Sequence, residues 1–306
     1  MTDVVSRNRL PEVLHSRYRL DRLLGTGGES SVYAAHDLVL HRDVAVKLRV
    51  ADPMAPEDLL DQQAEALRHA ALSHPALTTL FDAGIDLTDP SRPQVYSVME
   101  RVPGEDLRQR LRHGALPARQ VCWIGCDLAE AVGYLHGSGL IHRDVKPANV
   151  LLTDGERETR IRGKLTDFGI AKPIEELEPS ESTVGTAAYL SPEQVEGYDA
   201  TPRSDVYALG LVLLESLTAR RAFPGGVERS AFARLDRQPD IPSHIPAPMR
   251  SVLRDMTARN PADRPSPTDV STRLQRIVVS GQLRRGAFHL PLGRVLERRR
   301  PRPDRV

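Results

Sequence analysis

Residues Gly139–Leu152 read GLIHRDVKPANVLL, and this stretch combines two features that seldom occur together. Its apolar ends are typical of chain that enters and leaves a buried sheet. Its middle holds five polar side chains, which are His142, Arg143, Asp144, Lys146 and Asn149. Because buried polar groups are costly unless each has a partner, this density points to a functional site.

The composition is that of an ordinary globular protein. The 306 residues carry a formal net charge of +1, and only 4% of them are aromatic, so nothing favours nucleic acid as a partner. The first ten residues hold no apolar core of signal-peptide length. The longest apolar run, Ala208–Leu217, is too short to span a bilayer and contains Glu215. We therefore expect no transmembrane segment and a cytoplasmic location.

The two cysteines, Cys122 and Cys126, lie four residues apart in a helical pattern. A structural metal site needs further ligands, which the neighbouring sequence lacks. We expect both thiols to be small core residues on one helix face.

Residues 18–102 are predicted to form a lobe rich in strands. A helical run at 55–72 interrupts it, with leucine and alanine at helical spacing and acidic residues near its start. Short alternating or β-branched runs at 17–24, 30–37 and 43–50 predict an antiparallel meander. The runs 78–86 and 94–101 then resume the sheet.

Residues 103–279 are predicted to form a lobe of helices. The run 204–219 is apolar nearly all round, which predicts a central buried helix. Other helical runs are 118–139, 249–258 and 266–279. A sheet lobe followed by a helical lobe is an α+β arrangement, and the cleft between two lobes is a usual place for a ligand.

The two ends of the chain are predicted to lie outside these lobes. Residues 1–17 form a lead-in, and residues 280–306 are rich in arginine and proline without periodicity. This composition predicts a solvated, disordered tail. A basic docking segment for an acidic partner is the alternative.

Glycines at 25, 27 and 28 lie between two predicted strands, in the stretch LLGTGGESSVY. Glycine lets backbone N–H groups approach phosphate oxygens closely. A dinucleotide-binding motif is disfavoured because a strand, and not a helix, follows the glycines. One hairpin later Lys47 lies on a strand, where it could reach the phosphates, with Glu65 of the intervening helix as its expected partner.

These features occur in a fixed order: glycine loop, strand lysine, helix glutamate, HRDVKPAN, DFG at 167–169 and SPE at 191–193. This ordered set resembles the protein kinases, specifically the bacterial eukaryotic-like (Hanks-type) serine/threonine kinases. The resemblance covers residues 18–279. It implies a bilobal protein-kinase-like fold, with an antiparallel sheet lobe at 18–102, a helical lobe at 103–279 and an ATP cleft between them.

The resemblance assigns roles in phosphoryl transfer. It makes Asp144 the base that orients an acceptor hydroxyl, and Lys146 the cation that stabilises the moving phosphoryl group. Asn149 and Asp167 would hold Mg²⁺, with Mn²⁺ as the alternative, because hard cations prefer oxygen ligands. His142 and Phe168 are expected to pack rather than react.

The resemblance also implies an ATP-binding set and a structural set. Met99 falls at the gatekeeper position beside the adenine pocket. The ATP-binding residues are Leu24, Gly25, Thr26, Gly27, Gly28, Glu29, Ser30, Ser31, Val32, Ala45, Lys47, Glu65, Glu100, Val102 and Leu151. Glu193 and Arg264 should form a buried ion pair, and Asp205 should tether the catalytic loop backbone.

Three positions depart from the family pattern. Ser30 replaces the third glycine of the loop, from which we expect altered loop mobility without loss of ATP binding. SPE replaces APE and keeps its proline and glutamate. His69 stands where the family usually has an apolar residue, and we expect a neutral packed imidazole there.

The activation segment is expected to carry the regulatory hydroxyls. Ser180, Ser182 and Thr183 precede a Gly-Thr pair, and a phosphate on one of them would bind Arg143 and Lys172. We favour autophosphorylation at Thr183, although Glu178 and Glu181 could fill the basic pocket without modification. Thr186, together with Lys146, implies serine/threonine specificity. The expected partners are protein substrates with such hydroxyls, including a second copy of the chain.

Two other classes remain as alternatives. A pseudokinase, which binds nucleotide as a scaffold, would usually lack one of Lys47, Asp144, Asn149 and Asp167, and all four are present. A small-molecule phosphotransferase of related fold would generally lack the SPE segment and the loop before it.

Overall fold

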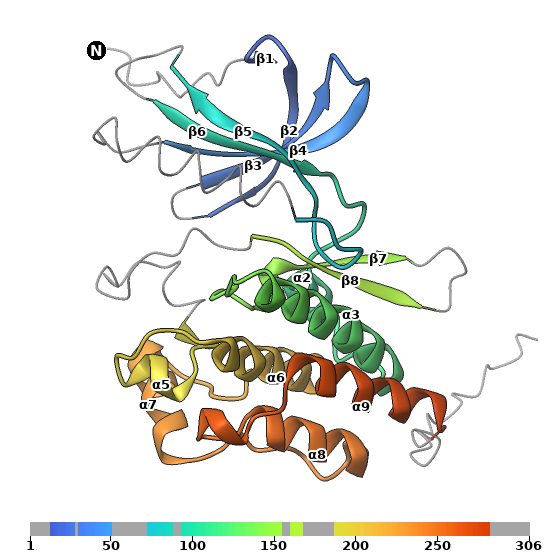
Figure 1. Ribbon diagram of the computed structural model, residues 1–306, viewed down its shortest axis with the longest axis vertical. Coiled ribbons are helices and arrows are strands. Elements are labelled where there is room, and N and C mark those ends of the chain that lie inside the picture. Colours follow the sequence, from blue (N-terminus) through green and yellow to red (C-terminus); the bar gives the residue numbers. More distant parts are fainter. Residues whose placement is uncertain are drawn as a thin grey trace, which may run out of the picture.

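The computed structural model describes residues 13–27, 30–50, 72–87, 93–154, 160–167 and 187–281. A sheet lobe and a helical lobe lie one above the other (Figure 1). This arrangement confirms the predicted α+β class with two lobes. The helix predicted at 55–72 lies outside the described residues except for Leu72, as do residues 1–12 of the lead-in and 282–306 of the tail.

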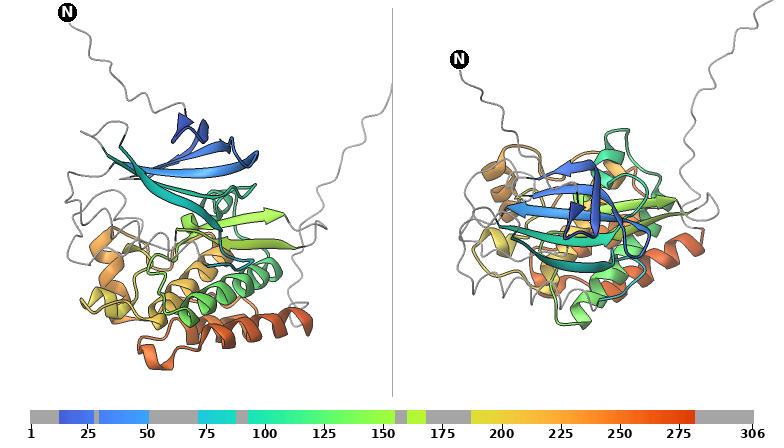
Figure 2. Two further views of the ribbon diagram at one scale, coloured as in Figure 1. Left: turned by 45° about the horizontal axis from the view of Figure 1, so that its top comes forward. Right: turned by 90° about the horizontal axis from the view of Figure 1, so that it is seen from above.

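The sheet lobe contains a six-stranded antiparallel sheet in the order β1-β2-β3-β4-β6-β5. Figure 2 shows this sheet from above, lying over the helices. Its strands are β1 (Val13–Leu14), β2 (Tyr18–Thr26), β3 (Ser30–Asp37), β4 (Arg42–Val50), β5 (Leu80–Asp86) and β6 (Gln94–Glu100).

The predicted meander corresponds to β2, β3 and β4, and the short strand β1, which the sequence did not indicate, pairs with β2 ahead of it. The chain adds β5 at the sheet edge, and β6 returns between β4 and β5. Alternating sequence identifies the β5–β6 hairpin but contains no information about which of its strands joins β4. The tertiary arrangement gives β6 a partner on both sides, and Val98 at its centre is fully buried.

Alternation along β4 separates a core face from a cleft face. Val44, Val46 and Leu48 are buried in the core of the sheet lobe. Ala45 and Lys47 point to the opposite face because successive strand residues alternate. Lys47 thus reaches the helical lobe, where its ammonium group contacts Asp167.

The helical lobe is built on a single large core that runs from Leu72 to Ile277. Its helices are α2 (Leu107–Leu111), α3 (Ala118–Gly137), η1 (Pro147–Asn149), α5 (Pro192–Val195), α6 (Pro202–Thr218), α7 (Val227–Asp236), α8 (Ala247–Met256), η3 (Pro261–Asp263) and α9 (Pro267–Val279). The predicted helices at 118–139, 249–258 and 266–279 correspond to α3, α8 and α9.

Helix α6 is central, as its apolar sequence predicts. Most of its residues are buried, and it packs against α3 and α8. It begins at Thr201, whose side chain accepts a hydrogen bond from the Arg203 N–H in a capping box with Ser204. Gly210 allows α8 to approach, because a Cβ atom there would lie 2.9 Å from the Thr257 methyl carbon.

A small hairpin lies between the two lobes. Strands β7 (Val150–Asp154) and β8 (Ile161–Leu165) pair above α3 (Figure 1). The segment just before β5 pairs with this hairpin, because Leu77 forms an isolated parallel β-bridge with Leu165. The Thr78 N–H donates to Leu165 O at 3.0 Å. This backbone junction connects the lobes beside the catalytic stretch.

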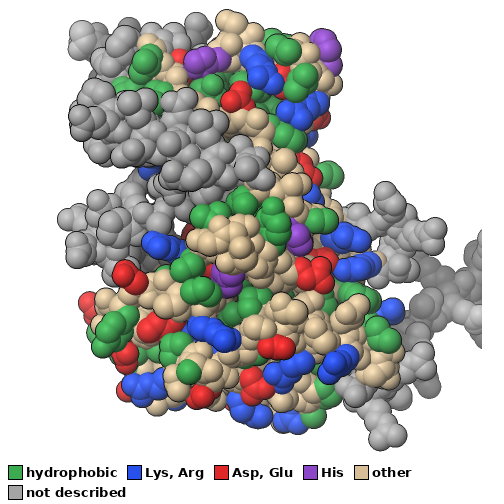
Figure 3. Space-filling model, viewed as in Figure 1, with side chains coloured by type: hydrophobic (Ala, Val, Ile, Leu, Met, Phe, Trp, Pro, Cys, Tyr) green, Lys and Arg blue, Asp and Glu red, His purple; other side chains and the backbone are tan. Residues whose placement is uncertain are grey.

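The face of the molecule seen in Figure 3 carries no dominant charge. Basic and acidic side chains are interspersed over the helical lobe in Figure 3, in keeping with the small net charge. None of the described helices is both long and apolar enough to cross a membrane. Cys122 and Cys126 are free and buried in α3, and burial raises the pKa of the Cys122 thiol to about 12. Both cysteines are core residues, as predicted.

Candidate functional site

The stretch 142–149 lies between α3 and β7 and ends in the short helix η1. The Asp144 Oδ2 atom lies 2.7 Å from Lys146 Nζ and 2.8 Å from Asn149 Nδ2. The Asn149 amide also donates to the Asp144 carbonyl at 2.8 Å. Two side chains of the initial motif, Lys146 and Asn149, therefore converge on the carboxylate of a third, Asp144.

Asp205, at the start of α6, forms hydrogen bonds with the backbone of this loop. Its carboxylate is buried and accepts the backbone N–H groups of His142 and Arg143, each at 2.9 Å. His136 Nε2 contacts the same carboxylate at 2.8 Å. Arg143 has φ of 66°, a conformation that costs a non-glycine residue of order 1–3 kcal/mol unless its surroundings fix it. The Asp205 contacts supply this support.

Asp167 joins the two lobes. Lys47 Nζ of β4 lies 2.9 Å from Asp167 Oδ1. The neighbouring Thr166 N–H donates to Asn149 O at 2.9 Å, and Thr166 O contacts His142 Nε2 at 3.1 Å. These bonds place Asp167 next to the loop at 142–149. The expected partner of Lys47, Glu65, lies outside the described residues, and the carboxylate that the structure places at Lys47 is Asp167.

The adenine-binding residues predicted on strands come from both lobes. Ala45 is buried and pairs with Met99, while Val32 pairs with Lys47 in the neighbouring strand. Leu151 of β7 forms an isolated bridge with Asp106. These positions fit the two sides of a nucleotide cleft.

The glycine loop is described only in part. Gly25 pairs with Val32 and Thr26 with Ser31, and the Gly27 N–H donates to Ser30 O at 2.7 Å. Leu24 is 40% exposed, so it does not belong to the core. Gly28 and Glu29 lie outside the described residues.

The segment that links the lobes contains an ion pair that the sequence did not suggest. Lys164 Nζ of β8 contacts both carboxylate oxygens of Glu100, at 2.7 and 2.8 Å. The Glu100 N–H donates to Thr79 O at 2.8 Å, so this N–H is engaged within the sheet lobe. Val102 follows directly after this contact region.

Two further contacts escaped sequence reasoning, namely His136 on Asp205 and Lys164 on Glu100. Both join residues more than sixty positions apart. No local spacing marks such a pair.

Glu193 of α5 and Arg264, which follows η3, form a buried ion pair. Arg264 Nη1 and Nη2 each lie 2.7 Å from a different oxygen of Glu193, and Ser204 Oγ donates to the same carboxylate at 2.7 Å. Burial alone would raise the pKa of Glu193, but the hydrogen bonds from Arg264 and Ser204 outweigh it and lower that pKa. The pair fixes the start of α5 against η3.

Asn149 and Asp167 carry an amide and a carboxylate, whose oxygens are ligands of hard divalent cations, and the Asn149 carbonyl is hydrogen-bonded to Thr166, next to Asp167. No cluster of three or more acidic, histidine or cysteine side chains suited to a metal exists among the residues that the structure describes. A divalent ion held here would therefore complete its coordination with phosphate oxygens and water. The donor set fits a nucleotide-bound cation.

The activation segment falls mainly on 168–186, which the structure does not describe. The predictions for this segment and its neighbours therefore remain predictions. The residues concerned are Phe168, Lys172, Ser180, Ser182, Thr183 and Thr186, together with His69 of the predicted helix.

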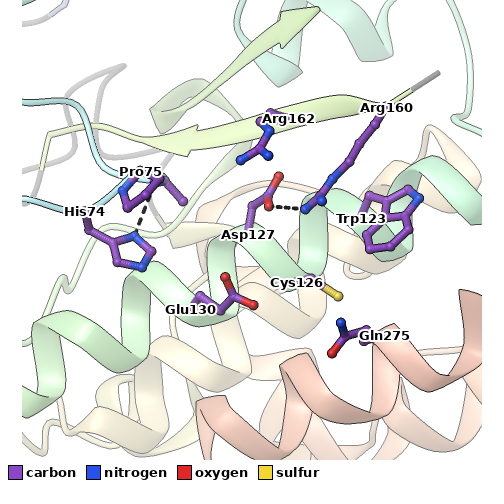
Figure 4. Close-up of a pocket in the computed structure, with 10 residues that line it drawn as sticks. His74, Pro75, Trp123, Cys126, Asp127, Glu130, Arg160, Arg162 and Gln275 are labelled. Carbon is purple, nitrogen blue, oxygen red and sulfur yellow. Dashed lines mark hydrogen bonds and ion pairs between the residues drawn. The ribbon is translucent and has the colours of Figure 1, made fainter. Parts of the chain in front are cut away.

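A cavity of about 240 Å³ lies between α3, β8 and α9 (Figure 4), and none of the predicted site residues lines it. Within it, Arg160 Nη2 contacts Asp127 Oδ1 at 2.6 Å, and the guanidinium lies over the Trp123 ring. Burial raises the pKa of Asp127, which Arg160 partly opposes.

Comparison with known proteins agrees with this geometry. The model of the protein kinase domain family matches residues 18–274. Serine/threonine-protein kinase PknB of Mycobacterium tuberculosis is 38% identical over 265 residues, covering 83% of this chain and 41% of the relative. PknB of Mycobacterium leprae is 39% identical over 264 residues, with 83% and 42% covered. PknA of Mycobacterium tuberculosis is 36% identical over 262 residues, with 84% and 60% covered.

The chain spans less than half the length of the PknB relatives that it matches. The matched part contains the loop at 142–149, Asp167, Lys47 and the Glu193–Arg264 pair. The chain therefore belongs to the protein kinase family, among the bacterial eukaryotic-like (Hanks-type) serine/threonine kinases.

Proposed function

We propose that this protein transfers the γ-phosphoryl group of ATP to serine and threonine hydroxyls of proteins. One observation carries the proposal: Asp144, Lys146 and Asn149 meet in one loop, and Asp167 beside them contacts Lys47 of the other lobe. A nucleotide between the lobes would thus have cations, a base and oxygen ligands around its terminal phosphate. The names of the relatives support the same activity.

The reaction balances with groups that this chain supplies. The acceptor oxygen forms a bond to the γ-phosphorus, and the bond from that phosphorus to the ADP oxygen breaks. The hydroxyl proton passes to the Asp144 carboxylate, and Lys146 stabilises negative charge on the transferring group. Lys47 would bind phosphate oxygens. Asn149 and Asp167 would hold Mg²⁺ or Mn²⁺, which supplies charge neutralisation of the phosphates when bound.

The acceptor class rests on two residues. Lys146 follows Asp144 as in serine/threonine kinases, and Thr186 would contact both. Protein substrates with serine or threonine acceptors are therefore proposed, and one of them would be a second copy of this chain.

The test is incubation of the full chain with labelled ATP, Mg²⁺ and dephosphorylated casein, followed by mapping of every phosphorylated residue. We expect label on serine and threonine of casein and of the protein itself. Lys47→Met, which removes the phosphate-binding ammonium but leaves the core face of β4 intact, is the inactive control. Absence of transfer by a folded, nucleotide-binding wild type would leave the pseudokinase as the explanation.

We also infer that phosphorylation within Ser180–Thr183 switches the enzyme on. Arg143 is exposed beside Asp144, where a phosphate could bind it together with Lys172. A phosphate carries about 1.5 to 2 negative charges against one for a carboxylate, so it would outcompete Glu178 and Glu181 for this pocket. Thr183 is the preferred acceptor.

This switch can be tested with a triple variant, Ser180→Ala, Ser182→Ala and Thr183→Ala. ATP-treated wild type should phosphorylate casein faster than phosphatase-treated wild type, and the triple variant should resemble the latter. Transfer between two copies predicts that the rate of self-labelling rises with the square of protein concentration. Equal casein rates for all three preparations would show that the glutamates suffice.

A further inference from the structure

Arg234 is a buried cation on a helix whose other polar residues are mostly exposed. It lies on α7, and its side chain is 1% exposed. Its guanidinium donates to the backbone carbonyls of Leu190 and Ala188, the second at 3.1 Å. It also donates to Ser230 O and Ser230 Oγ, each at 3.2 Å. Two of these bonds leave the helix and hold another segment.

No carboxylate pairs with Arg234 among the residues that the structure describes. Burial lowers the pKa of its guanidinium, and the nearest aromatic ring, Phe223, lies 5.2 Å away. A buried cation is costly unless its donors have partners, and the oxygens of Ser230, Leu190 and Ala188 supply them for Arg234. Because two of these acceptors belong to one short segment, the side chain also fixes the position of that segment.

The segment that Arg234 holds borders the catalytic loop. Residues 188–190 come just before Ser191 and α5, and Tyr189 and Leu190 line one small cavity together with Asp144 and Arg143. The other side of the segment is fixed by the Tyr189 hydroxyl, which donates to Glu215 Oε2 of α6 at 2.6 Å. Two helices thus fix three residues beside the proposed base.

We propose that Arg234 is a positioning residue for the protein acceptor. Arg234 fixes the position of residues 188–190 through the Ala188 and Leu190 carbonyls. The acceptor peptide would contact this segment while the acceptor hydroxyl lies at Asp144. This inference rests on the proposed kinase function. It assigns α7 a part in acceptor binding and none in nucleotide binding, since Arg234 contacts neither Lys47 nor Asp167.

The planar guanidinium suits this task because one group can donate to both carbonyls at once. Arg234→Met keeps the volume and removes every donor. Arg234→Lys keeps the charge but offers a single point donor. The matched control is Arg237→Met, since Arg237 is exposed and its guanidinium also lies near Phe223, 5.4 Å from that ring.

The experiment measures four quantities for each variant: KM for dephosphorylated casein, KM for ATP, the rate of ATP hydrolysis by water without casein, and Tm. For Arg234→Met we expect casein KM to rise at least tenfold. Its KM for ATP and its hydrolysis rate should stay within about twofold of wild type. Arg234→Lys should be intermediate, and Arg237→Met should match wild type.

The outcomes separate the two proposals. Wild type that transfers to casein, with an Arg234→Met casein KM unchanged, would overturn the positioning role and leave the kinase activity standing. A parallel loss of Tm, ATP affinity and hydrolysis in both Arg234 variants would show a purely structural role. Wild type that transfers to no protein would remove the kinase proposal and the positioning role with it.

Discussion

Asp144 receives two strong contacts, from the Lys146 ammonium and the Asn149 amide, both on its Oδ2 atom. Together these two contacts fix the orientation of the carboxylate. Its loop is fixed in turn by Asp205 through two backbone N–H groups. A carboxylate held in this way can orient a hydroxyl without reorganising.

Asp144→Asn should abolish most of the transfer while leaving ATP binding within a few-fold of wild type. The amide cannot accept the hydroxyl proton, whereas the proposed nucleotide contacts lie on Lys47, the glycine loop and Asp167. A positioned base contributes roughly 10²–10⁴-fold, so the turnover number should fall by at least about 100-fold. Steady-state kinetics and nucleotide titration measure the two effects. Turnover within about tenfold of wild type would contradict the role.

At the scale of single elements, Asp37 organises the turn between β3 and β4. It is fully buried, and Arg17 donates to both of its oxygens at 2.9 and 3.0 Å. Its Oδ1 atom also accepts the Val39 and Leu40 N–H groups. The hydrogen bonds from Arg17 are the main reason that the pKa of Asp37 is well below its usual value, and the two backbone bonds add to the effect.

Asp37→Asn should therefore destabilise the fold near neutral pH by about 1.5–3 kcal/mol, the range for hydrogen bonds to a charged group. A carboxyl whose pKa is lowered on folding contributes stability above its unfolded pKa of about 3.9, and this stability is lost as pH falls toward the folded pKa. Denaturant unfolding at pH 7 and pH 3 should show the difference between wild type and variant shrinking. The exposed Asp21→Asn serves as control, and a pH-independent difference would refute the electrostatic explanation.

The Glu193–Arg264 pair acts at the same scale, because it fastens α5 to η3. Glu193→Gln leaves the Arg264 guanidinium buried without a counter-charge, which should cost about 3–5 kcal/mol of unfolding free energy. The matched control is Glu196→Gln, whose partner Arg259 lies 3.5 Å away in an exposed pair, and which should change stability by less than about 1 kcal/mol. Chemical denaturation of both variants decides the matter. Equal effects would mean that burial of the first pair has no energetic consequence.

At the scale of the whole molecule, the two lobes are joined by backbone bonds of Leu165 and Thr78 and by the Lys164–Glu100 ion pair. The proposed nucleotide contacts are divided between the lobes, with Ala45 and Lys47 on one and Leu151 and Asn149 on the other. A nucleotide bound there would bridge the lobes in addition to the covalent link.

A non-hydrolysable ATP analogue with Mg²⁺ should raise the stability of the whole chain. At a free concentration 100 times its Kd, mass action adds about 2.7 kcal/mol, which corresponds to roughly 5–10 °C in Tm for a protein of this size. Differential scanning fluorimetry with and without Mg²⁺ measures the shift. Lys47→Met should show a smaller shift at the same concentration. No shift for wild type would argue against a nucleotide cleft at this place.

The elements that the sequence identified share a strong local signal. Helix α6 was predictable because nearly every side is apolar, and α3, α8 and α9 because their apolar residues recur at helical spacing. Helix α7 was not predicted, because its sequence is largely polar and an arginine is usually an exposed residue. The burial of Arg234 depends on carbonyls of residues about 45 positions earlier in the chain. Local periodicity cannot contain that information.

The residues proposed for phosphoryl transfer could be identified from the sequence alone, because acidic, basic and amide residues occur at short spacings within the stretches 142–149 and 167–169. Short spacing along the chain predicts spatial proximity, because residues of one tight loop necessarily lie close together. The tertiary structure alone decided the partners: Asp167 for Lys47, Glu100 for Lys164, His136 and the catalytic loop for Asp205. It also placed β6 between β4 and β5. Such contacts depend on how the two lobes and their layers pack, and packing brings together residues whose separation along the chain carries no pattern.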